Sequence, residues 1–163
     1  MIDKLAGYFS IKLKDEGNLY RYGRGKISGG DVILAEPLTY MNRSGDAVSV
    51  LLRYYKASPS ELILIYDDID LEAGQLKIKA KGGSGGHRGC ASVISSIGAE
   101  DFLRIRIGIG RPSSGGDVVG YVLSEFAPPE VPVIENAVES AADAVRMLVS
   151  SNDLVTAMNK YNR

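Results

Sequence analysis

One glycine-rich segment, residues 82–89, constrains this chain more than any other feature, and it carries the only histidine, His87. Alternating apolar residues and lysines over residues 75–81 predict a strand before it. Apolar spacing over residues 90–97 predicts a helix after it, with Gly98 as the C-terminal cap. A strand, a glycine loop and a helix N-terminus expose backbone N–H groups beside a positive dipole, which favours anion binding. A flexible connection with solvated lysines is the alternative, and glycine spacing alone does not exclude it.

The composition bounds the class of protein. A length of 163 residues suits one compact domain, residues 1–163. The net charge of −1 means that any nucleic-acid binding must come from a local basic patch. A single cysteine excludes an internal disulfide framework and fits a reducing compartment. No apolar run approaches membrane-spanning length and no signal peptide is visible, so we expect a cytoplasmic protein without membrane contact.

The apolar pattern predicts an α/β fold. Two short apolar runs, residues 32–35 and 62–66, predict strands buried on both faces. Residues 44–56 between them have helical spacing, so the three segments predict a strand–helix–strand unit with a right-handed crossover. Residues 103–109 alternate strictly and predict a strand with its arginines facing outward. Further helices are predicted over residues 2–9, 131–148 and 153–161. We expect a single domain with a mixed, mostly parallel sheet and helices on both faces.

Residues 112–132 form the longest irregular stretch and are rich in proline, glycine and serine. Long loops of this kind in compact domains are often functional. We therefore expect residues 112–132 to act as a lid or binding loop.

Three catalytic motifs can be weighed from the residues alone. Residues 82–86 match a G-x-S-x-G nucleophile elbow, but the only histidine follows the serine by three residues, which excludes the triad order. Cys90 at the start of a helix could be a nucleophile, although a small buried cysteine is the commoner outcome. Residues 67–70 offer three carboxylates for a metal, with His87 as a fourth ligand, but they lack the calcium-loop offsets. We expect one of the three carboxylates to be functional and the others to cap a turn.

A fourth hypothesis is a polynucleotide-linked substrate. Basic residues that could contact phosphates fall on neighbouring segments: Lys77, Lys79, Lys81, Arg88, Arg104, Arg106 and Arg111. Tyr40 and Asn42 follow the first predicted strand, beside Asp67 if the two buried strands are neighbours. An aromatic ring for stacking and an amide for hydrogen bonding suit a nucleotide or an aminoacyl ester. A helix cap is the alternative role for Asn42, but Ser44 is an equally good candidate for it.

Several blocks of the sequence, in order and over nearly the whole chain, resemble the bacterial-type peptidyl-tRNA hydrolase family. They are residues 36–45, 66–71 with Gly74, 85–89, 102–112, and 121–123 with Phe126. The resemblance implies hydrolysis of the ester between a peptide and the 3′ end of tRNA. It also implies no metal or organic cofactor, peptidyl-tRNA as the partner, and a monomer.

The resemblance assigns roles to individual residues. Asp67 matches the aspartate that orients a general-base histidine, which is physically reasonable because a carboxylate fixes the imidazole tautomer and stabilises its charged form. Tyr40 and Asn42 match an aromatic and an asparagine that line the substrate cleft. His87 matches a second family histidine and not the base. Arg88 stands where the family has an asparagine, and it could hold a tRNA phosphate.

Family chains open with a strand, a glycine-rich turn and an R-H-N triplet that supplies the general base, and residues 1–6 match the helix after it. The resemblance therefore implies that about two dozen residues, a strand and a loop, are absent. We expect residues 1–163 to leave Asp67 with no histidine to orient, and to bind tRNA but hardly hydrolyse it. A catalytically silent tRNA-binding or RNA-binding relative is the alternative function. A generic anion-binding enzyme is a third, but it leaves Tyr40, Asn42 and Asp67 unexplained.

Overall fold

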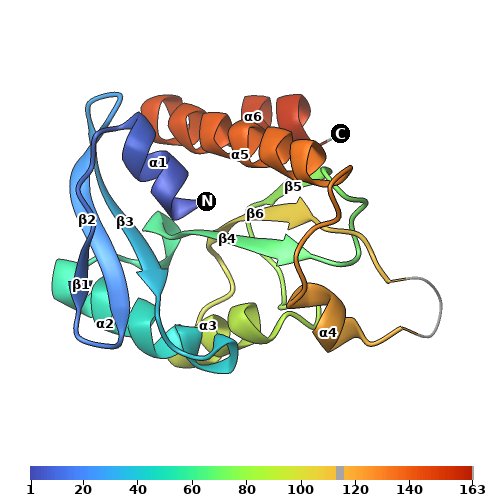
Figure 1. The fold of residues 1–163 in the computed structure, drawn as a ribbon. Coiled ribbons are helices and arrows are strands. Elements are labelled where there is room, and N and C mark those ends of the chain that lie inside the picture. The colour runs from blue at the N-terminus through green and yellow to red at the C-terminus, as the bar shows by residue number, and fades with distance from the viewer. Residues whose placement is uncertain (113–115, 163) are drawn as a thin grey trace.

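The structure, a computed structural model, describes residues 1–112 and 116–162, and its fold is α/β as predicted (Figure 1). The strands are β1 (Lys14–Glu16), β2 (Tyr20–Ile27), β3 (Gly30–Pro37), β4 (Ile63–Asp68), β5 (Leu76–Lys79) and β6 (Leu103–Gly108). The helices are α1 (Ile2–Tyr8), α2 (Ser44–Tyr55), α3 (Arg88–Ile97), α4 (Val118–Val122), α5 (Val131–Ser151) and α6 (Leu154–Tyr161). Two single 3-10 turns, η1 (Met41–Arg43) and η2 (Pro59–Glu61), precede α2 and β4. Every predicted helix is present to within a few residues.

The described strands form two three-stranded sheets, which differs from the predicted single, mostly parallel sheet. In the first, β2 pairs antiparallel with both β1 and β3. In the second, the central strand β6 pairs parallel with β4 and antiparallel with β5. The predicted strand–helix–strand unit is therefore divided, because β3 and β4 belong to different sheets. An apolar run indicates that a strand is buried but does not identify its partner.

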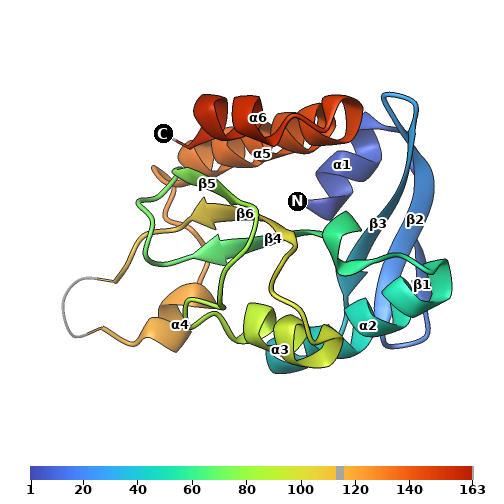
Figure 2. The same ribbon diagram turned by 180° about the vertical axis from the view of Figure 1, so that it is seen from behind.

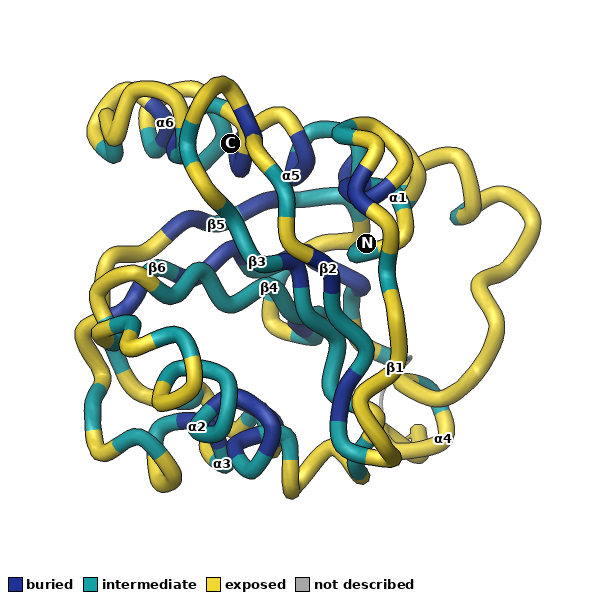
Figure 3. The backbone as a smooth tube through the Cα atoms, turned by 90° about the vertical axis from the view of Figure 1, so that its left-hand side faces the viewer, coloured by how far each residue is buried: buried dark blue, intermediate teal, exposed yellow. Residues whose placement is uncertain are grey.

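Helices cover both faces of the β4–β6–β5 sheet (Figures 1 and 2). On one face, α1, α5 and α6 enclose the larger core, where Ile78 and Ile105 are fully buried among alanines of α5. On the other face, α2 and α3 pack with Phe102 and the apolar residues of β4. Figure 3 shows the buried residues gathered on the inward sides of these layers.

The two arginines of β6 do not face solvent, so their predicted outward orientation is wrong. Arg104 is 1% exposed and donates to the carbonyl oxygens of Glu100 and Phe102, each at 3.0 Å. The side chain of Arg106 is 16% exposed and forms an ion pair with Asp68. The alternation correctly assigns the arginines and the isoleucines to opposite faces of β6. Both faces are covered in the structure, however: α1, α5 and α6 cover the isoleucines, and α3 with its flanking loops covers the arginines.

Two glycines let the start of α2 press against α3. The N–H of Gly45 donates to Ser92 Oγ at 3.0 Å, and a Cβ at Gly45 would lie 2.2 Å from the Ser92 carbonyl oxygen. A Cβ at Gly89 would lie 2.5 Å from the sulfur of Met41 in η1. Only glycine permits these approaches. As a result, residues 40–42 lie beside the first turn of α3.

Candidate active site

Three aspartates follow one another at the carboxyl end of β4, and two of them are paired with arginines. Asp68 is buried, forms the ion pair with Arg106 and accepts the N–H of Asp70 at 2.8 Å. Asp70 forms an ion pair with Arg111. These contacts give Asp68 and Asp70 a structural role in the turn after β4. The sequence predicted such a role for two of the three carboxylates. Within the described residues, no cluster of three or more metal-ligating side chains is present.

Asp67 contacts the histidine instead. Its Oδ1 lies 3.4 Å from Nε2 of His87, and their side chains are 34% and 18% exposed. Nδ1 of His87 accepts the backbone N–H of Cys90 at 3.1 Å, so the imidazole caps α3. With Nδ1 as an acceptor, the neutral ring carries its proton on Nε2 and donates it to Asp67. Asp67 therefore has a histidine beside it, His87, which is not the histidine that the resemblance gives as the general base.

The same contact sets the charge of the carboxylate. The hydrogen bond from His87 lowers the pKa of Asp67 below its ordinary value, against the opposing effect of burial. Asp67 is thus an anion over the physiological pH range. Beside it, the rings of Tyr66 and His87 lie 4.7 Å apart between centroids. Burial raises the pKa of Tyr66 to about 12, so this phenol remains protonated.

Cys90 is fully buried in the core between α2 and α3, which removes it as a nucleophile. This is the outcome that its apolar neighbours favour. His87 contacts Cys90 through the backbone N–H, which Nδ1 accepts at 3.1 Å.

Tyr40 and Asn42 lie next to the start of α3 and point no polar group into the core. Tyr40 is 83% exposed, and Asn42 is exposed within η1. The Met41 side chain between them touches the same glycine, Gly89, that adjoins the His87 ring. Asn42 does not cap α2, whose N-cap residue is Arg43. Both side chains are therefore free to contact a ligand at the N-terminus of α3, where Arg88 is also exposed.

The predicted basic patch is smaller than expected. Arg104 and Arg106 are internal and cannot reach a phosphate, which corrects their assignment as phosphate contacts. Arg111 is engaged with Asp70. The exposed cations that remain around the glycine loop are Lys79, Lys81 and Arg88, with Lys77 half-buried.

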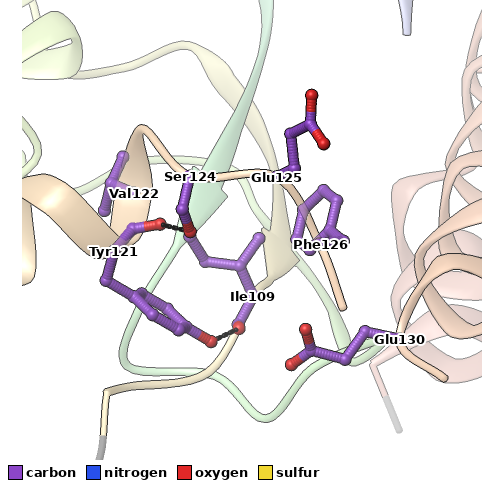
Figure 4. A pocket seen from close by; sticks show the side chains of 7 residues that line it. All are labelled: Ile109, Tyr121, Val122, Ser124, Glu125, Phe126 and Glu130. Carbon is purple, nitrogen blue, oxygen red and sulfur yellow. Dashed lines mark hydrogen bonds between the residues drawn. The ribbon is translucent and has the colours of Figure 1, made fainter. Parts of the chain in front are cut away.

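A small pocket opens next to the aspartates, on the side of α4 (Figure 4). The Tyr121 hydroxyl points to the Ile109 carbonyl oxygen and donates to it at 2.6 Å, as the dashed line in Figure 4 marks. The N–H of Ile109 donates in turn to the carbonyl oxygen of Asp68 at 3.0 Å. The remaining lining residues are Val122, Ser124, Glu125, Phe126 and Glu130. Part of the predicted lid thus adjoins the aspartate turn, while residues 113–115 of that lid lie outside the described residues.

Comparison with known proteins places this chain in a family. The family model described as peptidyl-tRNA hydrolase matches residues 1–163. The chain is 43% identical to the peptidyl-tRNA hydrolase of Geobacillus thermodenitrificans, over 99% of this chain and 87% of the relative. It is 40% identical to that of Bacillus anthracis, over 99% of this chain and 86% of the relative. The crystal structure of the Acinetobacter baumannii peptidyl-tRNA hydrolase superimposes with a TM-score of 0.91 at 34% identity, covering 99% of this chain and 82% of that one.

In this α/β fold, the contact between Asp67 and His87 lies at the carboxyl end of β4, which is where such folds place their active sites. The chain belongs to the peptidyl-tRNA hydrolase family, as the resemblance implied. Across residues 1–112 and 116–162, none of the helices has the length and apolar character needed to span a membrane.

Proposed function

We propose that this protein hydrolyses the ester between a peptide and the 3′ end of tRNA, at the surface formed by η1, the start of α3 and the carboxyl end of β4. The observation that carries the proposal is the contact between Asp67 and His87. It fixes an ionised carboxylate at the carboxyl end of a strand, where α/β sheets hold their active sites. The family match supports the substrate class.

The exposed residues around the Asp67–His87 contact have complementary roles in this proposal. The Tyr40 ring stacks on an unpaired base near the tRNA 3′ end, and Arg88 pairs with a phosphate. The Asn42 amide donates to the carbonyl oxygen of the ester and stabilises the negative charge that develops there. Residues 112–132 cover the bound peptide as a lid, supported by the pocket beside Ile109.

Asp67 accepts the proton in the chemical step. Oδ1 is held by Nε2–H of His87, while Oδ2 makes no hydrogen bond to the described residues. A water on Oδ2 attacks the ester carbonyl carbon and gives its proton to the carboxylate. The tetrahedral intermediate then expels the ribose oxygen, which takes that proton and leaves as a hydroxyl.

His87 does not take the proton itself. Its Nδ1 lone pair is used by Cys90 N–H, and its Nε2 carries the hydrogen that Asp67 accepts. A carboxylate with a lowered pKa is a weak base compared with an imidazole near neutral pH. We therefore expect slow turnover, about 10²–10⁴-fold below a family member that uses a histidine base.

The experiment is to mix residues 1–163 with tRNA carrying an N-acetylated amino acid and to follow release of free tRNA. Binding to the same tRNA is measured in parallel, and the Acinetobacter baumannii enzyme serves as the reference. Slow, saturable release supports the proposal. Binding without any release above the uncatalysed rate would instead support the silent RNA-binding alternative.

The proposed substrate also bears on the cellular location of the protein. Peptidyl-tRNA arises in translation, so we propose a cytoplasmic location, and the single buried cysteine agrees with a reducing compartment. We propose a monomer because all residues of the candidate site come from one chain. Sedimentation of the purified protein checks the oligomeric state.

A further inference from the structure

Arg104 is buried without a carboxylate partner, which is unusual for a charged side chain. It is 1% exposed, and none of its contacts within the described residues is an ion pair. Its guanidinium lies over the Phe102 ring at 3.9 Å from the centroid. A buried guanidinium needs hydrogen-bond partners to offset the loss of hydration. Backbone carbonyls supply them to Nη1 and Nη2, while the buried Nε has no partner among the described residues.

Those carbonyls come from two separate segments of the chain. Nη1 donates to Glu100 and Phe102, which precede β6, while Nη2 donates to Gly82, the first residue of the glycine loop. The N–H of Gly82 also donates to the Glu100 carbonyl oxygen at 3.2 Å. Arg104 therefore fastens the start of the loop to the segment before β6.

The rest of the loop has one internal backbone hydrogen bond, from the N–H of His87 to the Ser84 carbonyl oxygen at 3.1 Å, and no side chain of the described residues packs on its glycines. Gly82, Gly85 and Gly86 all have positive φ, and a Cβ at any of these three or at Gly83 would meet nothing within 4 Å. Packing does not fix this backbone, so its position depends on its two ends. One end is Gly82 under Arg104, and the other is His87, which closes the loop as the cap of α3.

The contact at the far end is sensitive to small movements. His87 Nε2 and Asp67 Oδ1 are 3.4 Å apart, near the outer limit of a hydrogen bond. A shift of a few tenths of an ångström in the loop breaks it. We propose that Arg104 is a positioning residue, which sets the His87–Asp67 contact by anchoring the glycine loop at Gly82.

Arg104→Lys tests this, because lysine keeps the charge but cannot donate to two segments with a planar fork. Ile105→Val is the matched control: it alters the next residue of β6, on the opposite face and in the other core. Since His87 is the only histidine, its imidazole gives one NMR signal that reports the contact directly. Asp67→Ala, which removes the acceptor, shows where that signal lies when the contact is lost.

We expect Arg104→Lys to move the His87 signal toward its Asp67→Ala position, and Ile105→Val to leave it in place. In the cleavage assay, kcat should fall about ten- to a hundredfold with KM little changed, since the effect is on geometry. An unchanged His87 signal in folded Arg104→Lys would overturn the proposal, as would equal effects of the two substitutions.

A second variant covers the case in which Arg104→Lys does not fold. Two glycines inserted between Gly82 and Gly83 leave the Arg104 contacts intact and release the loop from them. The same shift of the His87 signal is expected, and its absence would contradict the anchoring role. The kinetic part rests on the proposed hydrolysis, whereas the NMR part does not. If only the hydrolysis fails, the proposed function is contradicted, and the NMR result still decides whether Arg104 positions His87.

Discussion

Nε2 of His87 lies 3.4 Å from Oδ1 of Asp67, so the only imidazole of the chain supports the one carboxylate of the 67–70 turn that has no arginine. This contact predicts the pH dependence of cleavage. The pKa of Asp67 is lowered, so the carboxylate is ionised above its ordinary pKa and is lost as a base only when the pH falls through the lowered value. After subtraction of the Asp67→Asn background, kcat should be flat between about pH 5 and 8. A change of kcat within that range would show that a group other than Asp67 takes the proton.

Asn162 should stabilise the edge of the second sheet. Its side-chain amide accepts the N–H of Ile78 at 2.5 Å and donates to the Ile78 carbonyl oxygen at 3.1 Å, as a neighbouring strand would. Asn162→Ala leaves both groups of β5 without these partners. We expect it to lower the free energy of unfolding by about 1–3 kcal/mol. Urea denaturation measures this, with the exposed Asn159→Ala as the control; equal stability of the two variants would contradict the role.

The division into two sheets predicts low stability for residues 1–163. Among the described strands, β3 pairs only with β2 and β4 pairs only with β6, so each has an unpaired edge. Unpaired strand edges leave backbone groups without partners and favour association between chains. We expect a thermal midpoint below the range of about 45–65 °C that is usual for mesophilic domains. A cooperative melt at higher temperature, seen by circular dichroism, would show that the backbone groups at the edges of β3 and β4 have hydrogen-bond partners.

Arg88 should contribute to tRNA binding through its charge. It is exposed at the first turn of α3, where the helix dipole also favours a phosphate. Arg88→Ala should weaken tRNA binding and reduce the slope of log K against log salt by about 1. Arg146→Ala, which removes an exposed arginine of α5 on the other side of the sheet, should change neither. The same loss with both variants would indicate a nonspecific effect of net charge.

The sequence predicted local structure well because helices and caps depend on neighbouring residues. The helix of residues 90–97 ends at Gly98 in a left-handed conformation, as its position indicates. β1 and β2 were not predicted, since residues 20–27 carry two glycines and three basic residues in place of a clear apolar alternation. The partners of β3 and β4, and the burial of Arg104, depend on segments distant in the chain.

The candidate site was predicted through the family resemblance more than through spacing. Asp67 and His87 are twenty residues apart, and no local pattern brings them together. The structure also separates roles that the sequence leaves open, because Asp68 and Asp70 are tied to arginines and Cys90 is buried. The charge on Asp67 and the capping role of His87 require the fold.

The most direct test of the account compares Asp67→Asn with Asp70→Asn in cleavage of N-acetyl-aminoacyl-tRNA by residues 1–163. The two substitutions are the same and only three residues apart, but Asp70 pairs with Arg111 at an exposed turn. We predict that Asp67→Asn abolishes cleavage above background and leaves tRNA binding intact, while Asp70→Asn retains most of the activity. Undiminished cleavage by Asp67→Asn would contradict the central claim that Asp67 takes the proton of the attacking water.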